Sequence, residues 1–324
     1  MLLAVLILTV GAYTAVRQDA FLTEYNLNNL LLATMPLALV AIGQTNALLV
    51  GGFDVSVAAL VTMCVVTASF TLKPDETTFA LFLGSLAILG VGLATGIFNA
   101  TLIRVLRLPS IIATLGTFSI LEGASLLLRD HPEGPINSDV IDALTTSIGF
   151  MPVAFIGVIV LVVLADLWLY RSRTGMAVRA VGLDETSARR LGMSTGRIVF
   201  LAFVVCSLMA SIAGFFESAQ VQIGSPIIGA YALTSIAAAV LGGASLAGGR
   251  GSFVGTLLAA LFLSEISNVL PLFSEPTEYA AMTIGVLILF ALVLYQLPEL
   301  IARWRSGRQS VGRLQAPEGD APAA

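Results

Sequence analysis

Long apolar segments recur along almost the whole chain and limit what it can fold into. A helix that crosses the hydrocarbon core of a bilayer needs about 20 consecutive apolar residues. Ten segments approach this length: 2–16, 29–50, 53–72, 79–103, 109–128, 152–170, 198–222, 230–247, 252–270 and 279–297. We therefore expect an all-α, polytopic membrane protein with eight to ten transmembrane helices. The first and eighth segments fit the length requirement least well, and the tight turn between the second and third allows one of them to be broken or re-entrant.

The scarcity of charge excludes a large soluble domain. Only 11% of the 324 residues are charged, whereas a soluble globular chain usually carries about 25%. The formal net charge is −4 and the sequence has no long basic run, so nothing in it indicates a nucleic-acid partner. Its apolar surface is instead expected to face membrane lipid.

The basic residues set the expected orientation, because cytoplasmic loops are enriched in Lys and Arg. With both termini in the cytoplasm, only Arg17, Lys73 and Arg129 fall on the outer side. The other thirteen fall inside: Arg104, Arg107, Arg171, Arg173, Arg179, Arg189, Arg190, Arg197, Arg250, Arg303, Arg305, Arg308 and Arg313. We therefore predict a multi-pass protein of the bacterial inner membrane with cytoplasmic termini.

The chain divides into a transmembrane domain over residues 1–302 and a short cytoplasmic tail. Gly, Pro and Ala in residues 303–324 predict disorder there. Gly51-Gly52 ends the second apolar segment, and Gly242-Gly243 lies near the end of the eighth. Each pair precedes a short polar turn and another apolar run. Because transporters often contain repeats with broken helices, this spacing indicates a possible repeat of two halves, although chance matches are common in a chain with 30 glycines.

The residues of enzyme active sites are missing from the sequence. The phosphate-binding pattern G-x-x-x-x-G-K-[ST] is absent, and the single histidine, His131, lies in an expected outer loop. Cys64 and Cys206 lie far apart in apolar segments, which gives no metal-ligand spacing. We expect no catalytic residues, no metal and no cofactor in this chain, so uphill transport would take its energy from another subunit or from an ion gradient.

The longest cytoplasmic loop, at about 171–197, is expected to contain a short helix over residues 183–193. Asp184 can cap its start and Glu185 suits the positive end of its dipole. Ala188 and Leu191 are three residues apart on one face, and Gly192 can end the helix. The other residues of this candidate segment are Leu183, Arg189 and Arg190. Such a helix can dock against a partner or rest on the lipid headgroups.

Polar residues within apolar segments are the candidates for a translocation pathway, because such groups are costly in lipid. Gln44, Asn46, Asn99 and Asn268 offer amides to a polar solute, and interhelical hydrogen bonds account for each of them equally well. Asp54 follows the Gly51-Gly52 break, where it can cap a helix or belong to a gate.

Two further features of the membrane segments carry alternatives. Glu217 and Glu265 leave open a proton-coupled mechanism. A glycine-rich cytoplasmic turn allows close approach of a partner chain and comprises Gly242, Gly243, Gly248, Gly249, Arg250 and Gly251.

The stretch AVGLDETSARRLGM at 180–193 resembles the cytoplasmic coupling segment of permease subunits in ATP-binding-cassette importers of the ribose, xylose and galactose type. Four other stretches are similar in the same order: ALVAIGQTNALLVGGFDVSVAALV at 38–61, GIFNATLI at 96–103, LPSIIATLGTFSILEG at 108–123 and LTSIAAAVLGGASLAGGRGSFVGTLLAALFL at 233–263. The resemblance covers about residues 29–297. Glu122 and Ala58 depart from the family pattern, in which a basic or neutral residue and a glycine are usual.

The resemblance implies a mechanism and a set of partners. Two permease chains, identical or different, would form a pathway for a monosaccharide such as a pentose or hexose. A periplasmic sugar-binding protein would deliver the solute, and a cytoplasmic ATPase pair would bind ATP and Mg²⁺. The segment 183–193 would transmit the motion of the ATPase. The alternatives are a permease for branched-chain amino acids or another small polar solute, and an ion-coupled secondary transporter that depends on Glu217, Glu265 or Asp54.

Overall fold

The computed structural model describes residues 2–227, 231–273, 279, 282–283 and 285–286. The expected tenth apolar segment, apart from a few single positions, and the expected tail at 303–324 lie outside the described residues. Four short strands occur in the described part: β1 (Glu133–Pro135), β2 (Ser147–Ile148), β3 (Met151–Pro152) and β4 (Ile223–Gly224). β1 pairs antiparallel with β4, and β2 pairs antiparallel with β3.

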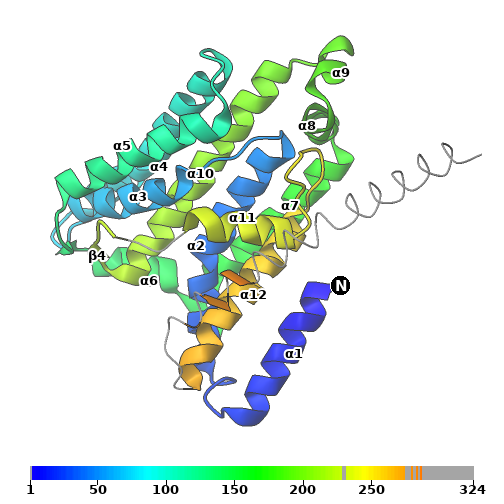
Figure 1. The fold of residues 1–324 in the computed structure, drawn as a ribbon. Helices are drawn as coiled ribbons and strands as arrows, with labels where there is room; N and C mark the ends of the chain where they lie inside the picture. Colours follow the sequence, from blue (N-terminus) through cyan, green and yellow to red (C-terminus); the bar gives the residue numbers. More distant parts are fainter. Residues whose placement is uncertain (1, 228–230, 274–278, 280–281, 284, 287–324) are drawn as a thin grey trace, which may run out of the picture.

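Helices make up most of the described chain (Figure 1). They are α1 (Leu2–Arg17), α2 (Glu24–Leu49), α3 (Val57–Thr71), α4 (Thr78–Arg104), α5 (Ser110–Leu128), α6 (Ser138–Thr145), α7 (Val153–Arg171), α8 (Arg173–Leu183), α9 (Glu185–Arg190), α10 (Thr195–Val221), α11 (Tyr231–Leu241) and α12 (Phe253–Leu272).

Six of these helices are long and apolar enough to cross a membrane, namely α2, α4, α5, α7, α10 and α12. Three shorter apolar helices, α1, α3 and α11, coincide with the first, third and eighth expected segments. The third and eighth were predicted too long. Extended and turn backbone occupies residues 51–56 before α3, and α11 ends at Leu241, six residues before the predicted end. The chain breaks after α2 at Gly51 and Gly52 as expected, and a re-entrant course for either segment stays a prediction.

Helix α2 forms the centre of the bundle, because 83% of its most apolar window is buried. Helix α10 packs along α2, α3 and α4, and α12 packs along α2 and α11. Helices α4, α5 and α7 lie at the edge of this core, with only 28%, 22% and 22% of their windows buried (Figure 1). The apolar residues that these three helices expose are suited to lipid contact.

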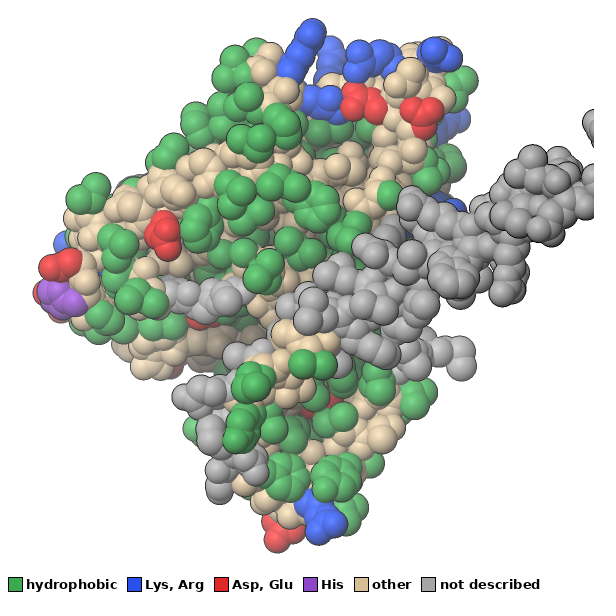
Figure 2. Space-filling view, in the orientation of Figure 1, with side chains coloured by type: hydrophobic (Ala, Val, Ile, Leu, Met, Phe, Trp, Pro, Cys, Tyr) green, Lys and Arg blue, Asp and Glu red, His purple; other side chains and the backbone are tan. Residues whose placement is uncertain are grey.

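The two ends of the bundle differ in charge. Most basic side chains gather at one end, over α8, α9 and the neighbouring helix ends, with a few acidic groups among them (Figure 2). Arg104 and Arg171 are the last residues of α4 and α7. That this end faces the cytoplasm stays a prediction from the sequence.

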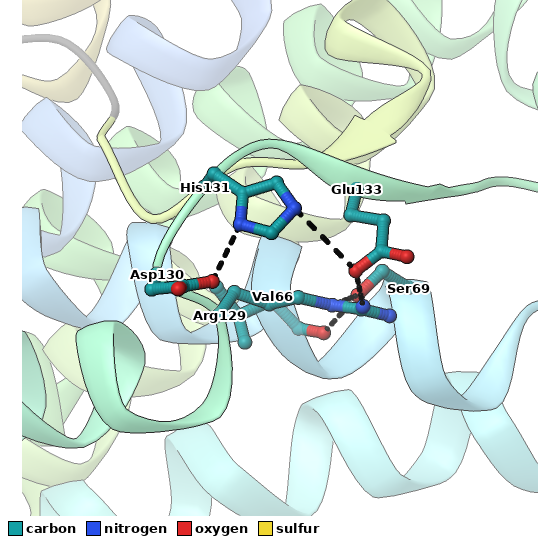
Figure 3. Close-up of polar contacts among 6 residues, drawn as sticks. All are labelled: Val66, Ser69, Arg129, Asp130, His131 and Glu133. Atoms are coloured by element: carbon teal, nitrogen blue, oxygen red, sulfur yellow. Dashed lines mark hydrogen bonds and ion pairs between the residues drawn. The ribbon is translucent and has the colours of Figure 1, made fainter.

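The loop after α5 is held to α3 by Arg129 (Figure 3). Arg129 Nε donates to Ser69 Oγ at 3.2 Å, and Arg129 Nη1 donates to Glu133 Oε2 at 3.0 Å. His131 lies between Asp130, 2.5 Å from its Nδ1, and Glu133, 3.8 Å from its Nε2. The hydrogen bond from His131 is the main cause that lowers the pKa of the Asp130 carboxyl. The side chains of Asp130, His131 and Glu133 are all exposed, so their ion pairs contribute little to stability.

Candidate coupling and translocation sites

The helix expected over 183–193 is shorter than predicted, and Asp184 separates it from a preceding helix. Leu183 is the last residue of α8, which corrects the prediction that the short helix begins there, and α9 spans only Glu185–Arg190. Asp184 caps α9 as predicted, because its Oδ1 accepts from Thr186 N at 2.9 Å and its Oδ2 from Ser187 Oγ at 2.5 Å. The hydrogen bond from Ser187 is the main cause that lowers the pKa of Asp184.

Ala188 and Leu191 point in different directions, which corrects the expectation that they share a face. Ala188 is 2% exposed and belongs to the hydrophobic core, whereas Leu191 is 77% exposed. Gly192 has a φ of 82°, a left-handed conformation that glycine adopts freely, and it ends the segment as predicted. The segment therefore has an inner face held by Ala188 and an outer tip formed by Leu191.

Glu185 joins α9 to the end of α4 through a paired ion contact, here called the α4–α9 clasp. Arg104 Nη1 and Nη2 donate to Glu185 Oε1 and Oε2 at 3.0 and 3.1 Å, and Arg189 Nη2 donates to Oε1 at 2.7 Å. Partial burial acts to raise the pKa of Glu185, but the hydrogen bonds and charges of the two arginines outweigh it and lower that pKa. A planar guanidinium matches a carboxylate in this two-bond geometry, so α9 and α4 are fixed in a defined relation.

The glycine-rich turn packs against α8 and the end of α2. Gly249 N donates to Leu49 O at 2.9 Å. A β-carbon added to Gly182 of α8 would overlap the Leu49 carbonyl oxygen, and one added to Gly248 would lie 2.5 Å from Gly182 O and 3.1 Å from Gly51 Cα. The close approach of three backbone segments therefore requires glycine at these positions.

The remaining residues of the glycine-rich turn contact α12 and α7. Gly242 lies against α12, where a β-carbon would meet the backbone of Thr256, and Gly243, Gly248 and Gly249 have positive φ. Arg250 is exposed and its carbonyl accepts from Ser245 N at 2.9 Å, while Gly251 O accepts from Tyr170 Oη at 2.8 Å. The turn is therefore tied to α7 as well.

A buried polar network surrounds the break between α2 and α3. Asp54 Oδ1 accepts from Ser56 N at 3.0 Å and Ser56 Oγ at 2.5 Å, and Asn99 Nδ2 donates to Ser56 Oγ at 2.8 Å. Thr117 Oγ1 then donates to Asn99 Oδ1 at 2.6 Å. Asp54 was expected to be able to cap α3, but the helix begins at Val57 and Asp54 holds the preceding turn instead. The network links α3, α4 and α5 at the helix break.

The other amides predicted for a pathway lie on α2 and α12. Asn46 Nδ2 donates to Ala202 O at 3.0 Å, and Asn46 also lines a cavity of about 800 Å³ between α2, α7, α8 and α10. Gln44 is fully buried, and neither its Nε2 nor its Oε1 has a hydrogen-bond partner among the described residues. Asn268 and Asn26 donate to each other at 3.0 and 3.2 Å beside a cavity of about 510 Å³. The structure thus separates these four amides into different places.

The two membrane carboxylates also lie apart. Tyr231 Oη donates to Glu217 Oε2 at 2.7 Å. Glu265 is 3% exposed on α12 and its Oε2 has no partner among the described residues. These groups form no pair with each other or with Asp54, and the described residues contain no cluster of three His, Cys, Asp or Glu that could hold a metal ion.

Some contacts were not found from the sequence. Asp166 of α7 binds the start of α12, whose N-cap is Ser252, because its carboxylate accepts from Phe253 N at 2.7 Å and Ser252 Oγ at 3.0 Å. Arg104 was counted only as a cytoplasmic charge. The contacts of Asp166 with Phe253 and of Arg104 with Glu185 join residues about 80 to 90 positions apart, so no local sequence pattern predicts them. The only available signal was that Asp166 and Arg104 lie near the end of an apolar segment.

Comparison with known proteins adds independent observations. Residues 26–292 match the model of a family described as branched-chain amino acid transport system / permease component. The chain is 33% identical over 287 residues to the Autoinducer 2 import system permease protein LsrC of Enterobacter sp. (strain 638), covering 85% of this chain and 80% of that protein. It is 36% identical over 266 residues to LsrC of Yersinia enterocolitica, covering 79% and 71%. No solved structure matches.

Proposed function

Because the chain belongs to the permease-component family of branched-chain amino acid transport systems, we propose that it is the membrane-spanning permease subunit of an ATP-driven importer. It is a multi-pass inner-membrane protein and has no catalytic role of its own. ATP and Mg²⁺ act in a separate cytoplasmic ATPase, and a periplasmic binding protein delivers the solute. A second permease chain, identical or different, completes the pathway.

The observation that carries the coupling assignment is the α4–α9 clasp beside an exposed tip. Leu191 is exposed and available to a partner, while Ala188 anchors the same segment in the core. Glu185 then connects the segment to the end of α4 through two hydrogen bonds from Arg104. A force that an ATPase exerts on Leu191 would therefore be transmitted to helix α4 through the contact of Glu185 with Arg104. Arg189 and Arg190, which are exposed, would choose an acidic partner surface.

One side of helix α5 is a candidate wall of the translocation pathway, in addition to the predicted amides. Gly116, Ser119, Glu122 and Gly123 are all exposed and recur at helical spacing on one side of α5. A carboxylate within a span rarely faces lipid and usually faces a cavity or a partner chain. We therefore place this side of α5 against the solute pathway or the second permease chain, and its other exposed sides against lipid. In the first arrangement, Glu122 acts in substrate preference.

The predicted amides contribute to the pathway to different extents. Asn46 and Asn268 border cavities and remain available to a solute hydroxyl after a change of side-chain conformation. Gln44 has unpaired amide atoms for the same purpose. Asn99 and Asp54 hold the helix break, which suits a gate because a broken helix can change direction there.

The topology that best fits these elements has eight to ten spans and two cytoplasmic termini. It also contains a repeat in which α2–α3 corresponds to α11–α12. In both units a glycine with left-handed φ, Gly51 or Gly243, follows the first helix closely. The two breaks contact each other through the hydrogen bond from Gly249 N to Leu49 O.

The solute is most consistent with a small polyhydroxylated compound, either a monosaccharide or autoinducer 2. The relatives named for autoinducer 2 import support it, since about a third of the aligned residues are identical over most of both chains. The family description supports a second candidate, a branched-chain amino acid. These candidates differ in chemistry, because amino acid recognition needs partners for an ammonium and a carboxylate.

Reconstitution tests the proposal. The tagged chain is purified in gentle detergent from its own membranes and partner subunits are identified by mass spectrometry. The proposal expects an ATPase subunit in stoichiometric amount, which the Leu191→Asp variant loses, and uptake in proteoliposomes that requires ATP. Uptake by the chain alone that collapses with the proton gradient would contradict it and favour a secondary transporter dependent on Glu217, Glu265 or Asp54. Competition between ribose, autoinducer 2 and leucine for uptake would then separate the solute classes.

A further inference from the structure

A basic cavity lies between the end of α4, the loop that follows it and α9. Its volume is about 760 Å³, and its charged lining consists of Arg104, Arg107, Arg189 and Glu185. Three guanidinium groups therefore surround one carboxylate. Such a cavity attracts an anion, because the single carboxylate neutralises only part of the positive charge.

Its depth follows from the length of α4. The helix has 27 residues and ends at Arg104, so it is about 40 Å long at 1.5 Å per residue. This equals the thickness of a bilayer that includes its headgroup layers, about 40–45 Å. Helices α4 and α5 are also mostly unburied by the protein. The cavity thus lies at the level of the cytoplasmic headgroups, next to lipid-facing helices.

The α4–α5 loop has the pattern of a segment that rests in the membrane interface. Val105, Leu106 and Leu108 are 69%, 60% and 39% exposed, and they alternate with Arg104 and Arg107. Exposed apolar side chains at this depth can contact acyl chains, while arginine side chains extend toward phosphate.

The arginines differ in how much of their donor capacity is used. Glu185 binds both Nη atoms of Arg104 and one Nη of Arg189. Arg104 Nε is buried with no partner, and Arg107 is exposed with no ion pair, among the residues that the structure describes. Arg107 thus retains its donors for an incoming anion, and a phosphate offers several oxygens for a guanidinium group.

We propose that this cavity binds the phosphate headgroup of an anionic phospholipid from the cytoplasmic leaflet, with the apolar side chains of the α4–α5 loop against its acyl chains. The lipid is favoured over an acidic peptide of a partner because the cavity adjoins lipid-facing helices and exposed apolar residues. Its occupancy would place the phosphate beside Arg107 and leave Arg104 paired with Glu185 in the α4–α9 clasp.

The test measures lipid binding by the purified chain and needs no ATPase, so its failure is separate from any failure of the proposed function. The chain is placed in nanodiscs of phosphatidylglycerol and phosphatidylcholine, and retained lipids are counted by native mass spectrometry. We expect bound phosphatidylglycerol, with affinity reduced about tenfold in Arg107→Gln, because hydrogen bonds to charged groups are of this strength. Arg107→Lys should retain part of the affinity. The matched control Arg197→Gln, an exposed cytoplasmic arginine outside the cavity, should bind normally.

Each other outcome overturns the proposal. Equal retention of phosphatidylglycerol by the wild type and Arg107→Gln would refute the site. Binding of inorganic phosphate without binding of phosphatidylglycerol would assign the cavity to a free anion. Loss of ATPase-subunit capture in Arg107→Gln, with lipid retention unchanged, would assign it to a protein contact. Thermal unfolding of Arg107→Gln should match the wild type, because its side chain is exposed and unpaired.

Discussion

The α4–α9 clasp is the contact through which movement of α9 is expected to reach the membrane, and a double-mutant cycle measures its contribution. The cycle compares the wild type with Arg104→Gln, Glu185→Gln and the double variant. Glu185→Gln keeps the shape of the side chain and removes its charge, and Arg104→Gln removes the guanidinium group. The coupling energy obtained belongs to the pair, because effects that each residue exerts elsewhere cancel.

The expected magnitude follows from geometry and exposure. The side chains of Arg104 and Glu185 are 21% and 36% exposed, and two bonds of 3.0 and 3.1 Å join them. Exposed ion pairs contribute about 0.2–1 kcal/mol, whereas hydrogen bonds to charged groups contribute about 1.5–3 kcal/mol. A partly exposed pair with two bonds falls between these ranges, at about 1.5 kcal/mol. If the transition state of coupling needs the clasp, loss of this energy slows solute-stimulated ATP hydrolysis about tenfold.

The assay is ATP hydrolysis and solute uptake by the chain reconstituted with its ATPase in nanodiscs and proteoliposomes. Arg197→Gln is the matched control, because Arg197 is an exposed arginine outside the clasp and has no ion pair among the described residues. This variant should hydrolyse ATP at the rate of the wild type. The reasoning would be refuted by strictly additive effects of Arg104→Gln and Glu185→Gln, or by a loss in Arg197→Gln as large as that in Arg104→Gln.

Three further predictions concern the same region. Leu191→Asp should keep the melting temperature of the isolated chain and lose ATPase capture. Ala188→Asp should lower the yield of folded chain, because it places a charge at a site that is 2% exposed, which costs several kcal/mol. Equal melting of the two variants in a thermal shift assay would contradict this. Gly182→Ala should destabilise the chain by at least about 1–3 kcal/mol, because its β-carbon would overlap the Leu49 carbonyl. Gly196→Ala should be neutral or slightly stabilising, because open space surrounds that position. Chemical unfolding of both variants measures the difference. The pKa of Glu185 is lowered in the folded chain from an ordinary value of 4.5. The clasp therefore stabilises the folded chain fully above about pH 4.5, and this stabilisation is lost as the pH falls through the folded pKa. The difference in stability between wild type and Glu185→Gln should shrink on acidification, and a difference that is constant with pH would refute this prediction.

The sequence predicted the parts of the fold that depend on local patterns. Apolar length located α2, α4, α5, α7, α10 and α12 to within a few residues at most of their ends, because a span is defined by its own composition. Asp184 and Gly192 were placed correctly as cap and stop for the same reason, since each acts on its nearest neighbours.

The failures concern residues whose roles depend on distant neighbours. Ala188 and Leu191 share a helical spacing, and only the core packed against α9 decides that one is buried and the other exposed. Asp54 looked able to cap a helix, but the polar groups of α4 and α5 hold the chain in a turn, so that α3 begins later. The clasp and the contact of Asp166 with the start of α12 join distant segments, and a single sequence contains no sign of such pairs.

Two routes of contact connect α8 and α9 to the membrane helices, and the glycine-rich turn belongs to one of them. One route passes from α9 through Glu185 and Arg104 to α4. The other passes from α8, where Gly182 touches the Leu49 carbonyl and the Gly248–Gly249 backbone, to the breaks after α2 and α11. A side chain does not fit between these backbones, so we expect α8 and both breaks to move together. A displacement of α8 and α9 would then reach both the buried helix α2 and the more exposed helix α4 in a single step.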